Sequence, residues 1–271
     1  MITDELFLSD PFDFSEKNRN LFLKSFQQNC AHHYEHNKFF KFIWERADFL
    51  PRDIKTEKDL NLVPYIMVNI FKHHELKSCP DSDIVLSLGS SGTTGQRSMI
   101  YLDQNSLEQV KHLAYAIHES LGMTDNQKYN YLCFTYDPKA ANDLGTAFTD
   151  ELLTSFTDRN EIYYTFQHDG TDFKFNEKET IEKLKEFEKS KYPTRILGFP
   201  AFLYQLIEKH DISFDLGHDS WVQTGGGWKN HQDKQIPKEE FRRIVSERLN
   251  IPEGNIRDLF GMVEHGIPYV D

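Results

Sequence analysis

The residue types that bear most directly on chemistry lie between two short apolar runs. Residues 89–98 read Gly-Ser-Ser-Gly-Thr-Thr-Gly-Gln-Arg-Ser. Small residues let the backbone approach a ligand closely, and successive N–H groups in such a loop converge into a nest for an anion. Hydroxyl groups add donors for the oxygens of a polyphosphate, and the loop supplies them from Ser90, Ser91, Thr93 and Thr94. The composition favours a phosphate-binding loop, and a polar hairpin turn is the alternative.

This loop differs from the phosphate loop of the P-loop NTPases. That signature requires Gly-Lys followed by Ser or Thr at the start of a helix. Here Gln96 follows Gly95, and the apolar run that begins at Met99 is typical of a strand. Residues 84–102 therefore predict a strand, a tight loop and a second strand.

Two further segments lie at the carboxyl ends of predicted strands. Thr224-Gly225-Gly226-Gly227-Trp228 contains three consecutive glycines, which let a flat base lie against bare backbone. A flexible turn is the alternative for this segment. The second segment reads Asp258-Leu259-Phe260-Gly261-Met262-Val263-Glu264-His265, and its acidic residue after a strand is weak evidence on its own. Ligands of open α/β sheets gather at the carboxyl ends of strands, so both segments are candidate ligand contacts.

An alternation of strands and helices is expected to position these loops. Two aromatic-rich helices are predicted within residues 14–47, with Ser15 as a cap. Further strands are predicted at 131–136, 161–166, 195–197, 221–224 and 256–260, and helices at about 105–121, 140–156, 177–190, 200–210 and 238–249. This order argues for an α/β fold of layered, mostly parallel sheets with flanking helices. We expect a helical N-terminal segment at residues 1–80 and an α/β portion at 81–271.

Composition narrows the class of protein. The 271 residues are 38% hydrophobic and 14% aromatic, as in globular proteins, and the net charge of −12 argues against a nucleic-acid surface. No stretch reaches the ~20 apolar residues that span a bilayer, and the acidic N-terminal region is unlike a signal peptide. Cys30, Cys79 and Cys133 form no CxxC pair and suit a reducing compartment, so we expect a cytoplasmic protein. The histidines near His32 are expected on a solvated helix face.

The run from Ser90 to Gly95 resembles the phosphate loop of the adenylate-forming superfamily, which includes acyl-CoA ligases, luciferases and nonribosomal adenylation domains. The two later segments stand in the superfamily's order and at about its spacing. Two positions depart from its pattern. Arg97 and Ser98 stand near the usual Pro-Lys, and Val263 replaces a hydroxyl residue that reaches the α-phosphate.

The resemblance implies roles for individual residues in binding ATP and Mg²⁺. The loop Ser90, Ser91, Gly92, Thr93, Thr94 and Gly95 would hold the phosphates, with Thr93 and Thr94 as catalytic donors. Gly225, Gly226 and Gly227 would border the adenine. Phe260, followed by Gly261, would stack on the base, and Asp258 would accept a hydrogen bond from the adenine amino group. Glu264 would bind Mg²⁺, which prefers hard carboxylate oxygens.

Within the superfamily, the details look most like the bacterial bioluminescence acyl-protein synthetases of the LuxE type. The similar parts are Asp10 to Phe14, the phosphate loop, Arg195 to Pro200 and Phe260 to His265. The resemblance implies activation of a fatty acid as acyl-adenylate and its transfer to a protein thiol. The implied partners are a fatty acid and the acyl reductase and acyltransferase subunits of a fatty acid reductase complex. An aryl- or acyl-CoA ligase relative and a non-catalytic scaffold subunit are the alternatives.

The family's later features cannot be placed in this sequence. They are a ribose-binding aspartate, a hinge, a mobile C-terminal portion with a lysine, and an acyl-accepting cysteine. We therefore expect that the C-terminal portion is absent from this chain. Cys30 and Cys133 fall in predicted regular elements, where a buried thiol is expected, and Cys79 in a loop is the least unfavourable acceptor.

Overall fold

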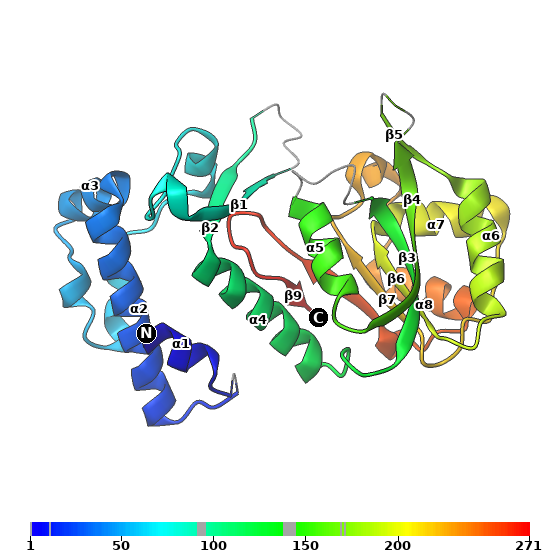
Figure 1. Cartoon of the computed structure of the whole chain (residues 1–271), viewed down its shortest axis with the longest axis horizontal. Coiled ribbons are helices and arrows are strands. Elements are labelled where there is room, and N and C mark those ends of the chain that lie inside the picture. Colours follow the sequence, from blue (N-terminus) through cyan, green and yellow to red (C-terminus); the bar gives the residue numbers. More distant parts are fainter. Residues whose placement is uncertain (1, 11, 91–95, 138–144, 169, 171) are drawn as a thin grey trace. The chain divides into compact units, whose positions relative to one another are not determined.

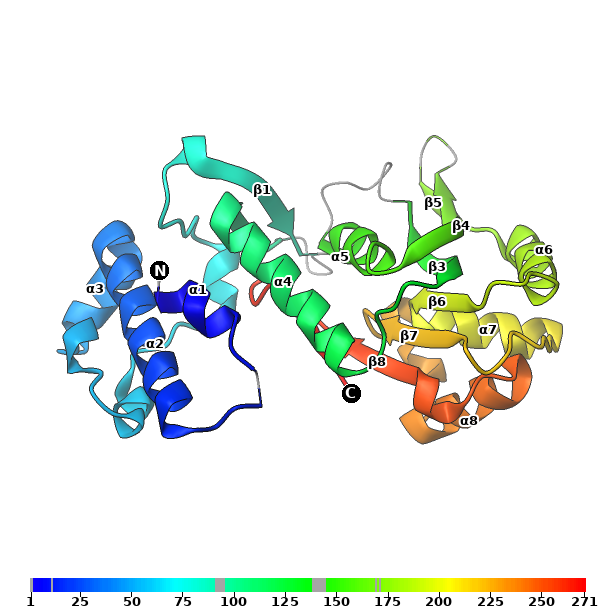
Figure 2. The same cartoon turned by 60° about the horizontal axis from the view of Figure 1, so that its bottom comes forward.

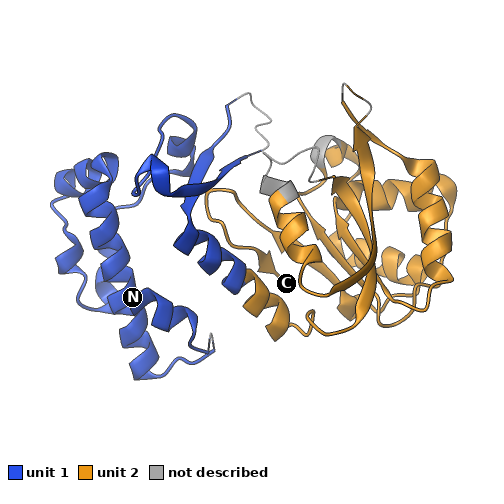
Figure 3. Cartoon of the chain, in the orientation of Figure 1, with its two compact units in different colours: residues 1–113 blue, residues 114–271 orange. Residues whose placement is uncertain are grey.

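The computed structural model describes residues 2–10, 12–90, 96–137, 145–168, 170 and 172–271. These residues form two compact units, residues 1–113 and 114–271, which Figure 3 shows in blue and orange. The division expected between residues 80 and 81 lies within the first unit and stays a prediction. None of the helices described is long and apolar enough to cross a membrane.

The first unit begins with helices. They are α1 (Ile2–Phe7), α2 (Glu16–His36) and α3 (Lys38–Arg46). Ser15 caps α2, because its hydroxyl accepts a hydrogen bond from the Asn18 N–H at 3.3 Å, as the sequence predicts. Trp44 of α3 is fully buried and packs with Cys30, Phe49 and Ile54, so a small aromatic-rich core holds these helices together.

A hairpin and the first part of a helix complete the described part of the first unit. Four short 3₁₀ helices, at Pro51–Asp53, Glu57–Leu62, Val68–Lys72 and Asp81–Asp83, lead to β1 (Ile84–Gly89). That strand pairs antiparallel with β2 (Met99–Asp103), and Gly89 lies opposite Met99. The two strands predicted on either side of the candidate phosphate loop are therefore confirmed. The helix α4 (Gln104–Ser120) follows, and the division between the two units falls within it.

The second unit is built on one seven-stranded sheet, in the order β5-β4-β3-β6-β7-β8-β9. Its strands are β3 (Lys128–Tyr136), β4 (Asp158–His168), β5 (Phe173–Phe175), β6 (Thr194–Gly198), β7 (Trp221–Gly225), β8 (Ile256–Phe260) and β9 (Tyr269–Val270). The five inner strands, β4, β3, β6, β7 and β8, are parallel to one another. At the two edges of the sheet, β5 pairs antiparallel with β4 and β9 pairs antiparallel with β8. The helices are α5 (Gly145–Thr154), α6 (Glu177–Glu188), α7 (Pro200–His210) and α8 (Lys238–Leu249), with 3₁₀ turns at Lys229–Lys234 and Glu253–Asn255.

Helices cover both faces of this sheet (Figures 1 and 2). Because side chains alternate along a strand, Leu132 and Phe134 of β3 point into one core, whereas Tyr131 and Cys133 point into another. The first core includes residues of α6, α7 and α8, and the second includes Leu153 of α5. The predicted class, an α/β fold of mostly parallel strands with flanking helices, is confirmed.

The element predictions differ from the structure mainly at the edges of the sheet. The observed bounds of α8 and β8 agree with the predicted ones. The other predicted strands of the second unit are longer in the structure than predicted, by one to a few residues. The helix expected from about residue 140 is described only from Gly145, because residues 138–144 lie outside the described part. The short helix α1 and the edge strands β5 and β9 were not predicted.

Candidate functional site

The carboxyl ends of β6, β7 and β8 meet at one edge of the sheet, and two of the three predicted loops begin there. Thr224 of β7 pairs with Asp258 of β8, and Gly225 pairs with Leu259. A Cβ atom at Gly225 would lie 3.2 Å from the Leu259 carbonyl oxygen, so glycine lets the two strands stay close. Gly226 and Gly227 have φ angles of 73° and 67°, the left-handed region that favours glycine. Backbone geometry therefore explains the presence of glycine at these three positions, independently of the predicted contact with adenine.

The Asp258 side chain is oriented by two neighbours from different elements. Its Oδ1 accepts a hydrogen bond from the Thr224 hydroxyl at 3.2 Å. Its Oδ2 lies 3.4 Å from the Nζ atom of Lys238, the first residue of α8. Thr224 is buried, and the side chain of Asp258 is 45% exposed. The carboxylate is therefore held in place and still open to a ligand.

A cavity of about 230 Å³ lies beside Asp258 in the second unit. Its lining includes Thr224, Gly227, Trp228, Lys238 and Arg257. The Trp228 ring packs edge-to-face on Tyr204, with ring centroids 5.6 Å apart, so its position is fixed by the core. The cavity therefore brings the glycine segment and Asp258 together, and their contacts with adenine stay predictions.

The carboxyl end of β8 exposes an aromatic ring. Phe260 is 60% exposed at the carboxyl end of its strand, and it lies across from Tyr269 of β9 with ring centroids 6.4 Å apart. An exposed phenyl ring at that position is available for stacking on a flat ligand. Gly261 follows it and is also exposed.

Glu264 lies in a turn of the segment that follows β8 and is partly exposed. In the part of the chain that the structure describes, its carboxylate has no hydrogen-bond or ion-pair partner. No group of three or more His, Cys, Asp or Glu that would hold a metal ion occurs among the described residues. Mg²⁺ is commonly bound by one or two protein carboxylates together with phosphate oxygens and water. The single open carboxylate of Glu264 fits that mode of binding and does not fit an all-protein metal site.

The predicted phosphate loop is only partly within the described residues. Ser91, Gly92, Thr93, Thr94 and Gly95 lie outside them, so their predicted contacts stay predictions. The two ends of the loop are tied together. The Ser90 N–H donates to the Ser98 carbonyl oxygen at 3.0 Å, and the Ser98 N–H donates to the Ser90 hydroxyl at 2.9 Å. The Ser90 hydroxyl therefore accepts a bond that closes the loop, a role that the sequence did not predict.

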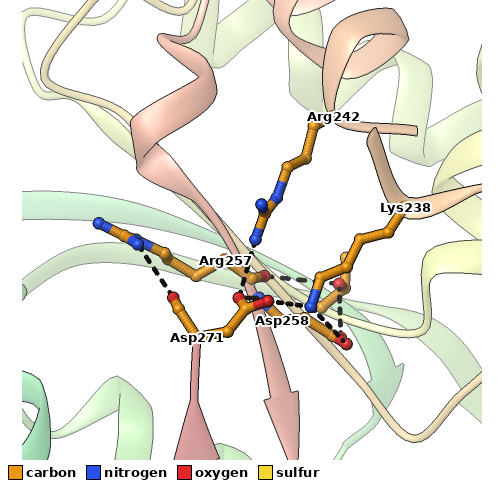
Figure 4. Close-up of polar contacts among 6 residues, drawn as sticks. Lys238, Arg242, Arg257, Asp258 and Asp271 are labelled. Carbon is orange, nitrogen blue, oxygen red and sulfur yellow. Dashed lines mark hydrogen bonds and ion pairs between the residues drawn. The ribbon is translucent and has the colours of Figure 1, made fainter. Parts of the chain in front are cut away.

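A cluster of charged residues beside Asp258 was also not predicted (Figure 4). Asp271 forms an ion pair with Lys238, and its Oδ1 lies 2.9 Å from Nη2 of Arg242. Arg257 donates through Nη1 to the backbone carbonyl oxygen of Asp271 at 3.0 Å. Lys238 and Asp271 are 33 positions apart in the chain, so no local pattern reveals their contact.

None of the three cysteines has the surroundings of an activated nucleophile. Burial raises the pKa of the Cys30 thiol to about 11. Burial, with a contribution from Asp150, raises the pKa of the Cys133 thiol well above its usual value. Burial and the charges of Asp103 and Asp83 raise the pKa of the Cys79 thiol. The thiol rather than the thiolate therefore predominates at all three positions at neutral pH.

The fold is similar to that of solved structures of a CoA ligase. It is similar to a solved structure described as an open conformation of 2-hydroxyisobutyryl-CoA ligase in complex with 2-HIB-AMP and CoA. The TM-score is 0.65 at 13% sequence identity, over 94% of this chain and 58% of that chain. The same ligase in its thioesterification state gives a TM-score of 0.63 at 15% identity, over 92% of this chain and 50% of that chain. This chain therefore spans less than two thirds of the length of that ligase.

Sequence comparison gives the family. Residues 1–269 match the family described as "Acyl-protein synthetase, LuxE", and the chain belongs to that family. It is similar to the long-chain-fatty-acid–luciferin-component ligase of Vibrio harveyi, with 24% identity over 97% of this chain and 68% of the relative. The protein of the same name from Aliivibrio fischeri is 23% identical, over 97% of this chain and 68% of the relative.

Proposed function

We propose that this protein uses ATP to activate a fatty acid as an acyl-adenylate, from which the acyl group passes to a protein thiol. The observation that carries the proposal is the meeting of the glycine segment 225–227, Asp258 and Phe260 at the carboxyl ends of β7 and β8. That meeting occurs in a chain of the LuxE family, whose relatives are named for a ligase of long-chain fatty acids.

In this proposal, the adenine lies against the backbone of the glycine segment. Asp258 accepts a hydrogen bond from the adenine amino group, and the Thr224 hydroxyl and the Lys238 ammonium keep the carboxylate in position. The exposed ring of Phe260 stacks on the base. A base between a bare backbone and an aromatic ring is held by its two faces, and the carboxylate at its edge favours adenine over a base with a carbonyl there.

The phosphates are assigned to the loop that starts at Ser90. Its backbone N–H groups and the hydroxyls of Thr93 and Thr94 would donate to phosphate oxygens. The Glu264 carboxylate would hold Mg²⁺, which neutralises charge on the phosphates when bound. These assignments rest on residue type, on the resemblance to the superfamily and on the open carboxylate of Glu264.

The reaction itself needs positioning and charge neutralisation more than a strong base. A carboxylate oxygen of the fatty acid forms a bond to the α-phosphorus of ATP, and the bond from that phosphorus to the pyrophosphate oxygen breaks. Pyrophosphate leaves with the electron pair, so no proton has to be removed from the attacking group. N–H and O–H donors that face the developing charge are the main source of rate enhancement in such a step. A thiolate then attacks the acyl carbon, and AMP leaves.

Two measurements test the proposal. Isotope exchange between pyrophosphate and ATP should depend on tetradecanoate, and phenylacetate should not replace it. Exchange driven by phenylacetate would instead favour an aryl-CoA ligase. Calorimetric titration with ATP and Mg²⁺ should release or absorb heat, because the site binds nucleotide. The absence of any binding would contradict the proposal and favour a scaffold without catalytic activity.

The proposed partners follow from the family. The acyl group is expected to pass to an acyl reductase in a complex that also contains an acyltransferase. Mixing the purified protein with candidate reductase subunits, followed by size-exclusion chromatography, would test that association. Migration of the subunits as separate species would count against it.

A further inference from the structure

The segment that carries Glu264 is bounded by two antiparallel strands. Residues 261–268 run from the end of β8 to the start of β9, and Phe260 pairs with Tyr269 across the two strands. Within the segment, the N–H groups of His265 and Gly266 both donate to the Met262 carbonyl oxygen at 3.0 Å. The position of Glu264 therefore depends on how firmly β9 is attached to β8.

The strand β9 is only two residues long, and pairing over so short a length gives little stability. The next residue, Asp271, adds contacts that the strand lacks. Its Oδ1 accepts a hydrogen bond from the Asp258 N–H at 2.8 Å, and its own N–H donates to the Asp258 carbonyl oxygen at 3.2 Å. These contacts extend the pairing of β9 with β8 by one residue.

Charged groups reinforce the same attachment (Figure 4). Lys238 and Arg242 lie on one face of α8 and both contact the Asp271 carboxylate, while Arg257 of β8 binds its backbone carbonyl. Partial burial works to raise the pKa of Asp271, but the bonds from Lys238 and Asp258 and the charge of Arg242 outweigh it and lower the pKa. We call Asp271, Lys238 and Arg242 the latch, because they tie β9 to α8.

We propose that the latch positions the segment 261–268 and so places Glu264 for Mg²⁺ and Phe260 for the base. Asp271 touches neither the metal nor the nucleotide in this proposal, and it acts as a positioning residue through β9. Lys238 contacts two carboxylates, because besides its ion pair with Asp271 its Nζ atom lies 3.4 Å from the Asp258 carboxylate. The consequence for Mg²⁺ rests on the proposed function, whereas the effect on the segment itself does not.

Hydrogen–deuterium exchange of the free protein tests the effect on the segment. Asp271→Ala should speed exchange of the amides in residues 259–270 about tenfold, because several charge-assisted hydrogen bonds are lost together. Asp271→Asn keeps one acceptor for the Asp258 N–H and should give a smaller effect. Arg243→Met is the matched control, because Arg243 on the same helix pairs with Glu247 at 3.0 Å and is 54% exposed. Unchanged exchange in Asp271→Ala would overturn the proposal.

A second measurement tests the consequence for the site. The Mg²⁺ concentration required for ATP binding should rise roughly 10-fold or more in Asp271→Ala and in Lys238→Met, as is typical when a group that supports a metal ligand is lost. Arg243→Met should bind as the unsubstituted protein does. A faster-exchanging segment with an unchanged Mg²⁺ requirement would overturn the positioning role.

Lys238→Met changes α8, and Asp271→Ala changes the residue after β9. If one of these variants fails to fold, the other still tests the proposal. Neither Lys238 nor Asp271 belongs to the buried core of Phe241, Val245 and Ile256. Circular dichroism should therefore show both variants folded. If the unsubstituted protein binds no ATP at all, the proposed function fails, and the exchange comparison still decides whether the latch fixes the segment.

Discussion

The Asp258 carboxylate has structural contacts beside the ligand contact that we propose for it. The Asp258 backbone is paired on one side with β7 and on the other is bonded to Asp271, the residue after β9. Its side chain accepts from Thr224 and lies near Lys238, so little freedom remains to be lost when a ligand binds. A carboxylate held in this way favours affinity for a hydrogen-bond donor, because the entropic cost of ordering it has already been met in folding.

At the proposed phosphate loop, the prediction concerns a single hydroxyl. Thr93→Ala should slow acyl-adenylate formation about a hundredfold, the usual effect of removing one donor that faces charge in the transition state. The measurement is fatty-acid-dependent pyrophosphate exchange at saturating ATP. Ser106→Ala serves as a control hydroxyl from the same unit. An unchanged exchange rate in Thr93→Ala would remove Thr93 from the site.

At the proposed metal ligand, the prediction concerns a single charge. Glu264→Gln keeps the shape of the side chain and removes the charge that attracts Mg²⁺, so folding should persist while Mg²⁺-dependent ATP binding weakens by about tenfold or more. Thermal unfolding and calorimetry measure the two effects separately. Glu247→Gln, a change at an exposed carboxylate of α8, is the control. Equal Mg²⁺ dependence in Glu264→Gln and the unsubstituted protein would contradict the assignment.

At the scale of elements, the sequence predicts best where one local pattern decides the structure. Phe241, Val245 and Leu249 recur at helical spacing and are all buried, and the predicted helix has the observed bounds of α8. The strand β9 was missed because two residues cannot show a period and its partner is set by the tertiary fold. The latch was missed for the same reason, since Asp271 meets Lys238 only when β8 and α8 are packed.

In the candidate site, too, local sequence patterns reveal some features, and contacts between distant residues have no signal in the sequence. The glycine segment stands out by its composition, the segment from Asp258 to Glu264 was singled out by its resemblance to the superfamily, and the parallel pairing of β7 with β8 brings the two segments together. The restraints on Asp258 from Thr224 and Lys238 have no signal in the sequence, because each depends on side chains from separate elements meeting. The roles of Thr93, Thr94 and Glu264 stay predictions.

The turn from β6 into α7 gives a prediction about stability. Gly198 has a φ angle of 111°, and a Cβ atom there would lie 2.6 Å from the Phe134 carbonyl oxygen. Gly198→Ala should therefore lower the free energy of unfolding by about 3 kcal/mol, through backbone strain and a steric clash with β3. Urea denaturation measures the change. Gly254→Ala is the matched control, because nothing lies within 4 Å of the added atom and the backbone is not left-handed. Equal stability of the two variants would contradict this account of the turn.

At the scale of the whole molecule, family and fold agree over nearly the full chain. The match to the LuxE family covers residues 1–269, and the relatives align with 97% of the chain at 24% and 23% identity. Identity this low preserves the fold while leaving most surface residues free to change. Single substitutions therefore test the residues that we propose to bind nucleotide.

The three cysteines give the last prediction, which concerns the whole chain. Transfer of an acyl group from an adenylate requires a thiolate, and the thiols of Cys30, Cys79 and Cys133 all have raised pKa values. Incubation with radioactive tetradecanoate, ATP and Mg²⁺ should therefore leave residues 1–271 without a stable acyl thioester. Denaturing gel electrophoresis, hydroxylamine treatment and mass analysis measure the label. Because burial of Cys133 is complete, modification there would require local unfolding of β3. A hydroxylamine-sensitive adduct on any of the three cysteines would show that its thiol is activated when acyl-adenylate is bound, contrary to the surroundings described for it.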